Sequence, residues 1–441
     1  MDWGKLLNSQ RLMKDDIGDF DPHRSPFEVD ADRVIFASDF RRLQDKTQVH
    51  GATGNDYVRN RLTHSLEVSR VGRSLGTIVA ARLAEHPDFV MPDGSPISAR
   101  DAGHVVAAAS LAHDFGTPPF AHTGEDVISD FFARHPLGSA LIADLSPRMQ
   151  AELTRFEGNA QGFRVLARLQ GWRENGGLQL TLASLAAHSK YPYPADCDPQ
   201  YALKPNKYGY FESEAELFEQ VAHATGMVQL TQGAWARHPL AHLVEAADDI
   251  CYRIVDVEDA AVLGVLSFEE AEGLLAPVAG PLNGEYGRIP EPTRKLTYLR
   301  SKAISRLIED TADAYFSNIC DILDGEHPGD LVLQSPVRDQ LKHIERVSRT
   351  KIYANRKRAQ SDLAACRILE TILEAYCDAF YERETSNSGR LSARSKMVLR
   401  AFPGAERLPV RDRAGWLRGV LDYVSGMCDG FAAETAKVLA P

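Results

Sequence analysis

Apolar residues recur at helical spacing along most of this chain, while runs that alternate apolar and polar residues are nearly absent. Val68, Val71, Leu75 and Val79 lie three or four residues apart, which predicts a helix that begins near Thr63. Further helices are expected over 102–112, 124–134, 159–170, 178–187, 214–224, 240–261, 294–316, 334–345, 361–381 and 413–439. The predicted fold class is therefore all-α.

Two stretches interrupt this helical pattern. Residues 274–292 hold several Gly and Pro residues, and residues 191–210 hold four prolines, so each stretch predicts a long loop. A length of 441 residues allows two or three domains or one large helical body. We expect an N-terminal arm over 1–35, a core over 36–265, a connecting loop over 266–293 and a C-terminal helical region over 294–441 that packs on the core.

The composition excludes several classes of protein. Hydrophobic residues make up 44% and charged residues 25% of the chain, which excludes disorder as the dominant state. No apolar run reaches the roughly 18 residues of a membrane span, and residues 1–5 lack a signal-peptide pattern, so we expect a cytoplasmic protein without a membrane partner. Six cysteines without a CxxC pair predict reduced thiols. A net charge of −11 leaves only a local basic patch for binding polyanions.

His113 and Asp114 stand together at the end of the Ala-rich helix, directly before a turn rich in Gly and Pro. Neighbouring residues point in different directions on a helix, so both can reach one metal ion only at the helix end. Imidazole and carboxylate together suit Mn, Fe, Ni, Co or Zn, and Mg at the oxygen-rich limit. The pair is equally consistent with a capped helix that carries a satisfied histidine.

The helix expected over 240–261 carries a second polar pattern. Asp248, Tyr252 and Asp256 lie one above another at four-residue spacing, opposite the apolar face, whereas Asp249 lies off this stripe. Such a stripe can line a pocket with a metal ligand, an aromatic ring and a carboxylate. The alternative is the solvated acidic face of an ordinary amphipathic helix.

The segment after the turn offers an acid–base group. His122 can exchange a proton at neutral pH, and Glu125 lies three residues further along a helix, within reach of it. A surface His–Glu pair is the alternative. Basic residues near these groups can hold phosphate or lie in solvent. They are Arg59, Arg61, Lys190, Lys204 and Lys207.

Longer strings resemble one family. They are FRRL (40–43), KTQV (46–49), RLTHSLEV (61–68), HDFGTPPFAH (113–122), FEGNAQ (156–161), EAADDI (245–250) and DYVSGM (422–427). Together with the H…HD…D pattern, these strings are similar to deoxyguanosinetriphosphate triphosphohydrolases of the HD superfamily of metal-dependent phosphohydrolases. The resemblance covers nearly the whole chain and places the HD core at 36–265.

The resemblance implies hydrolysis of a dNTP to a deoxynucleoside and inorganic triphosphate, with a divalent metal, Mn or Mg before Fe, Co, Ni or Zn. The implied metal ligands are His64, His113, Asp114 and Asp248, and the implied catalytic pair is His122 and Glu125. The implied sugar contacts are Gln48, Tyr252 and Asp256, and the implied triphosphate contacts are Arg61, Asn159, Lys190, Tyr191 and Lys207. Family members self-associate, often as hexamers, and some bind single-stranded DNA.

The sequence departs from the family pattern in the turn, where Thr117 replaces an Asn, and in the segment 53–58, so no base is preferred among the dNTPs. One alternative function is an HD phosphohydrolase acting on a nucleoside monophosphate or cyclic nucleotide. Another is a nucleic-acid-binding regulatory protein with a secondary HD site, which a basic cluster favours. That cluster comprises Lys342, Arg346, Arg349, Lys351, Arg356, Lys357 and Arg358.

Overall fold

The computed structural model describes residues 1–12, 23–49, 57–171, 176–327, 329–354, 356–386 and 389–440, without the side chains of 356–358. The molecule is 67% helical, which confirms the all-α prediction. Within the described ranges the strands are β1 (Gln229–Thr231) and β2 (Ala234–Trp235), which form one antiparallel hairpin. No helix in these ranges is long and apolar enough to span a membrane.

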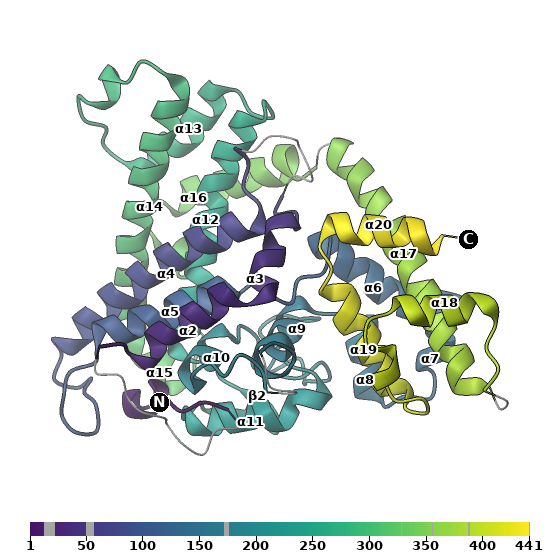
Figure 1. Cartoon of the computed structure of the whole chain (residues 1–441). Coiled ribbons are helices and arrows are strands. Elements are labelled where there is room, and N and C mark those ends of the chain that lie inside the picture. Colours follow the sequence, from purple (N-terminus) through teal and green to yellow (C-terminus); the bar gives the residue numbers. More distant parts are fainter. Residues whose placement is uncertain are drawn as a thin grey trace.

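The helices fall into two groups along the chain (Figure 1). The first half contains α1 (Trp3–Leu6), α2 (Pro26–Phe36), α3 (Ser38–Arg42), η1 (Leu43–Asp45), α4 (Arg61–Ala84), α5 (Ala99–Ala112), α6 (Ala121–Arg134), α7 (Pro136–Ile142), α8 (Pro147–Thr154), α9 (Gly158–Arg164), η2 (Val165–Leu169), α10 (Leu182–His188), η3 (Glu212–Glu214) and α11 (Ala215–Ala224). The second half contains α12 (Pro239–Val262), α13 (Phe268–Ala279), η4 (Tyr286–Arg288), α14 (Pro292–Ser317), α15 (Ile319–Asp324), η5 (Val332–Gln334), α16 (Arg338–Val347), η6 (Ser348–Ile352), α17 (Arg356–Thr385), α18 (Ala393–Ala401), η7 (Ala405–Arg407), α19 (Arg413–Ser425) and α20 (Asp429–Leu439).

Helices α4, α5 and α12 pack against one another and form the centre of the first core. Leu75 of α4, Val106 of α5 and Ile250 of α12 are fully buried there. A Cβ atom on Gly76 would lie 2.9 Å from the carbonyl oxygen of Ala102, so only glycine permits the close approach of α4 to α5. This packing brings the start of α4, the end of α5 and the middle of α12 together.

The C-terminal helices α17 to α20 form a second core with α6, on the side of the molecule away from α13 and α14 (Figure 1). The aromatic rings of Phe380 and Trp416 stack there with centroids 5.6 Å apart, and both side chains are fully buried. Because α6 belongs to this second core, the C-terminal region bears directly on the residues at the start of α6.

Most of the expected helices are present, with shifted ends. The single helix expected over 413–439 is wrong, because α19 ends at Ser425 and α20 begins at Asp429. Within the expected loop 266–293 the structure has α13, which Ser267 and Glu270 start with a capping box although Pro277 lies inside it. Residues 189–211 form a long loop without helix or strand, as predicted. The domain boundaries stay a prediction.

Candidate functional site

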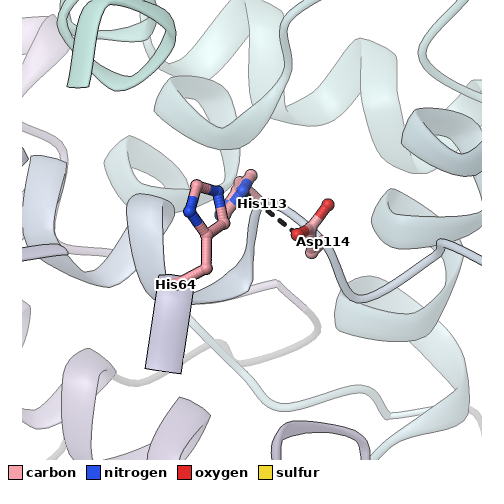
Figure 2. Close-up of side chains that lie close together, drawn as sticks. All are labelled: His64, His113 and Asp114. Carbon is pink, nitrogen blue, oxygen red and sulfur yellow. Dashed lines mark ion pairs between the residues drawn. The ribbon is translucent and has the colours of Figure 1, made fainter. Parts of the chain in front are cut away.

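Three side chains meet where α4 begins and α5 ends. Asn60 caps α4 through a capping box with Thr63, which places His64 in the first turn, and His113 and Asp114 follow the last residue of α5. One ligand atom from each of His64, His113 and Asp114 lies within 4.8 Å of the others. Figure 2 shows the three side chains converging on one spot. This is a cluster that can hold a metal ion.

Asp248, in the middle of α12, lies beside this cluster. Its Oδ1 is 3.0 Å from Nε2 of His64 and 3.7 Å from Nε2 of His113. Burial raises the pKa of Asp248, but the hydrogen bond from His64 and the nearby cations outweigh it and lower the pKa to about 2. The carboxylate therefore stays ionised, as a metal ligand must be.

The donor set fits a divalent metal. Nδ1 of His113 donates to the carbonyl oxygen of Ser110 at 2.7 Å, so its Nε2 presents a lone pair to Asp114 Oδ2 at 3.3 Å. Within the described chain, Oδ2 of Asp114 and Nδ1 of His64 are buried without hydrogen-bond partners. A lone pair and a carboxylate oxygen facing each other need a cation between them.

The acid–base pair lies at the start of α6. Nδ1 of His122 is 3.0 Å from Oε2 of Glu125, whose Oε1 accepts a hydrogen bond from the backbone N of Gly158 at 2.9 Å. This hydrogen bond and the charge of Glu125 raise the pKa of His122 above its usual value. The His122 side chain is exposed, whereas Glu125 is buried. The imidazole therefore points a free Nε2 outward and keeps its proton near neutral pH.

One cavity of about 460–560 Å³ scale joins these groups, and its volume is 560 Å³. Every site residue predicted from the sequence lines it, although their individual roles remain predictions. From the first half of the chain these are Gln48, Arg61, His64, His113, Asp114, His122, Glu125 and Asn159. From the second half they are Lys190, Tyr191, Lys207, Asp248, Tyr252 and Asp256. The cavity is large enough for a small organic ligand.

The lysines of the cavity face carboxylates. Lys190 Nζ lies 3.2 Å from Glu245, which also pairs with Arg237. Lys207 Nζ lies 2.6 Å from Glu157, a residue that is buried and also accepts a hydrogen bond from Asn159. The cations are thus held in place by acidic partners at one side of the cavity, where they can hold an anionic ligand.

Several lining residues were not predicted as part of the site. The Oη of Tyr353 donates to Oδ2 of Asp256 at 2.6 Å, and burial raises the pKa of Asp256 to about 7. Glu245 and His188 also line the cavity. Tyr353 follows α16 far along the chain, so no local pattern connects it with α12, whereas Glu245 is one helical turn before Asp249 and its spacing was a usable signal.

Arg59, named with Arg61 as a phosphate-binding candidate, does not line the cavity. Its guanidinium pairs with Glu67 and Glu258, each at 2.8 Å, and with Asp259. Arg61 does line the cavity and lies 2.6 Å from Asp114 Oδ1. The interpretation of Arg59 as a phosphate ligand is therefore wrong, because three carboxylates already hold it.

This network predicts a large stability effect. Replacing Arg59 with alanine leaves the carboxylate of Asp259 buried without its cation, which we expect to cost about 3–5 kcal/mol of unfolding free energy. Arg82 is the control, since its partners Glu309 and Asp313 are exposed and its loss should cost less than about 1 kcal/mol. Urea titrations measure both, and equal losses would contradict the assignment.

The basic cluster is only partly described. Arg349 pairs with Glu345 at 2.9 Å and Lys351 with Glu270 at 2.6 Å on the surface around α16. The side chains of Arg356, Lys357 and Arg358 lie outside the described residues, as do residues 53–56 of the divergent segment. Binding of single-stranded DNA at this surface stays a prediction.

The chain is similar to curated proteins along almost its whole length. A deoxyguanosinetriphosphate triphosphohydrolase-like protein of Pseudomonas aeruginosa is 38% identical over 99% of this chain and 98% of its own. Proteins of the same name from Synechocystis and Listeria monocytogenes are 38% and 32% identical, over 97% and 98% of this chain and equal shares of their own. No protein-family model matches. The chain belongs to the deoxyguanosinetriphosphate triphosphohydrolase-like family.

Proposed function

We propose that the protein is a metal-dependent dNTP triphosphohydrolase that converts a dNTP and water to a deoxynucleoside and inorganic triphosphate. The observation that carries the proposal is that one cavity of 560 Å³ combines the His64–His113–Asp114 cluster, the His122–Glu125 pair and two lysines. The relatives' names contain the same activity. No base is singled out among the four dNTPs.

His64, His113, Asp114 and Asp248 would hold the metal, with Mn or Mg as the expected ion. When bound, the ion neutralises charge at the α-phosphate and orients the attacking water. Arg61 lies between this group and the phosphates, because its guanidinium pairs with Asp114 and its Nε donates to the Thr47 carbonyl at 3.0 Å. It therefore fixes the orientation of Asp114.

His122 acts as the general acid in this proposal. Attack by water forms a bond to the α-phosphorus and breaks the bond from that phosphorus to the 5′-oxygen, which must gain a proton as the nucleoside leaves. The exposed Nε2 of His122 can deliver this proton because Glu125 holds Nδ1 and favours the protonated ring. The triphosphate keeps the oxygen that came from water.

The other side of the cavity suits a deoxyribose. Gln48 is a half-buried residue whose Oε1 has no hydrogen-bond partner in the described part of the chain, so it is free to accept from a 3′-hydroxyl. Asp256 lies across the cavity with Tyr353 bonded to it, and the ring of Tyr252 lies one helical turn before Asp256. Triphosphate would be held by Arg61, Asn159, Lys190, Tyr191 and Lys207.

Replacing Lys190 with methionine should raise the Michaelis constant for the dNTP about 10-fold to 100-fold and lower kcat less, because a charge-assisted contact contributes about 1.5–3 kcal/mol. Lys190 is the better of the two lysines to test, since Glu245 keeps Arg237 as a partner in the variant. Lys342→Met on α16 is the control for a lost surface charge. An unchanged Michaelis constant in Lys190→Met would contradict this role.

Hydrolysis in ¹⁸O-labelled water tests the proposed bond cleavage. The proposal requires one ¹⁸O atom in the triphosphate and none in the deoxynucleoside. Label in orthophosphate, with a nucleoside monophosphate as substrate, would favour the monophosphatase alternative. Self-association and binding of single-stranded DNA are further proposals that follow from the family resemblance alone.

A further inference from the structure

Asp429, the first residue of α20, joins two distant segments at the edge of the cavity. Its Oδ2 accepts hydrogen bonds from the backbone N of Thr47 at 3.0 Å and from Oγ1 of Thr47 at 2.6 Å. Its Oδ1 accepts from the backbone N of Phe120 at 2.9 Å. Asp429 itself does not line the cavity. One carboxylate thus bridges the segments that directly precede Gln48 and His122.

Further contacts support this arrangement. The buried Nζ of Lys46 donates to the carbonyl oxygens of Thr117 at 2.6 Å and Ser425 at 2.9 Å. The backbone N of Gly430 donates to Oδ2 of Asp45 at 3.1 Å. We call the contacts among residues 45–47, 117–120 and 425–430 the C-terminal junction. It fastens the gap between α19 and α20 to the catalytic turn.

The turn needs an external partner for a physical reason. Phe120 and Ala121 both adopt left-handed backbone conformations, with φ of 63° and 58°, and such residues cost about 1–3 kcal/mol each. Helix α6 has no side-chain cap of its own, because Phe120 occupies the cap position. The carboxylate of Asp429 satisfies the Phe120 amide and places a negative charge at the positive end of α6. His122 is the second residue of that helix.

The other arm of the junction reaches the metal cluster. The carbonyl oxygen of Thr47 accepts a hydrogen bond from Nε of Arg61 at 3.0 Å, and Arg61 pairs with Asp114 at 2.6 Å. Gln48, which lines the cavity, is the next residue after Thr47. A shift of Thr47 would therefore move both Gln48 and the guanidinium that orients Asp114.

We infer that Asp429 is a positioning residue for the catalytic turn: it holds the backbone of Phe120 and Thr47 so that His122 and Gln48 face one substrate. The inference rests on the proposed function, because His122 and Gln48 have their roles only there. The C-terminal helices are then part of the catalytic apparatus through a residue that touches neither metal nor substrate.

The test compares Asp429→Asn with Asp412→Asn. Asp412 caps α19 by accepting from the backbone N of Gly415 at 3.0 Å and does not line the cavity, so it controls for loss of a helix-end carboxylate. Asp429→Asn should lower kcat about 10-fold to 100-fold, the scale of a small misplacement of catalytic groups, with metal affinity unchanged. Hydrogen exchange should become faster in the peptide 117–125 of this variant only.

Thr47 provides a second variant if Asp429→Asn folds poorly. Thr47→Val removes the 2.6 Å hydrogen bond to Asp429 but leaves the Phe120 contact, whereas Thr47→Ser keeps both. We expect reduced kcat in Thr47→Val and recovery in Thr47→Ser.

The outcomes separate this inference from the proposed function. If the wild type releases triphosphate while Asp429→Asn matches Asp412→Asn in kcat and in exchange over 117–125, the positioning role is overturned and the function stands. If the wild type releases no triphosphate, the proposed function fails. Faster exchange in Asp429→Asn then still supports the held turn, and unchanged exchange overturns it.

Discussion

Replacing Asp248 with alanine is expected to abolish metal binding and to lower kcat/KM for a dNTP by at least about 10³-fold. The carboxylate lies 3.0 Å from His64 and 3.7 Å from His113, so it completes the donor set of the cluster. A bound metal contributes several kcal/mol of charge stabilisation, and each factor of ten in rate corresponds to about 1.4 kcal/mol. Metal content measured by mass spectrometry and steady-state kinetics check both parts.

Asp249 is the matched control, because it is adjacent in sequence but turned away from the cluster. Its Oδ2 pairs with Arg253 at 3.2 Å, and burial raises its pKa to about 7. Asp249→Asn should keep the metal affinity of the wild type. Loss of metal in Asp249→Asn with retention in Asp248→Asn would show that the wrong neighbour has been assigned to the cluster.

Replacing His122 with alanine should lower kcat by about 10²-fold to 10⁴-fold, the usual contribution of a general acid, while the metal stays bound. His122 is separate from the metal cluster, since its Nδ1 contacts Glu125. Near-normal turnover in His122→Ala with a full metal site would contradict the proposed mechanism.

The His122–Glu125 pair also predicts a pH dependence. The hydrogen bond and charge of Glu125 raise the pKa of His122, so the protonated acid persists to higher pH than that of a free histidine. The value of kcat should therefore be full below this pKa and fall as the pH rises through it. Glu125→Gln should move the fall to lower pH. A pH profile of Glu125→Gln that coincides with the wild type would contradict the pairing.

The site was predictable where chemistry follows local sequence. The HD dipeptide at a helix end, the Asp248–Tyr252–Asp256 stripe and the His122–Glu125 spacing each depend on residues within a turn or two of one another. The structure brings all of them to one cavity. Their meeting depends on the packing of α4, α5 and α12, which spacing does not encode.

Other features were not predictable because they depend on distant segments. The gap between α19 and α20 interrupts apolar spacing that continues through it, and its purpose appears only where Asp429 meets Thr47 and Phe120. Helix α13 forms despite Pro277 because its other end has a capping box. Arg59 looks like a phosphate ligand until three acidic side chains from two helices are seen around it.

The central claim is that this cavity releases an intact triphosphate from a dNTP. Purified protein with Mn or Mg is incubated with each of the four dNTPs and GTP, and deoxynucleoside, triphosphate, pyrophosphate and orthophosphate are separated. The account predicts equal amounts of deoxynucleoside and triphosphate, with no product from Asp248→Ala. Orthophosphate or pyrophosphate as the initial product, or no turnover of any dNTP by protein that has bound metal, would contradict it.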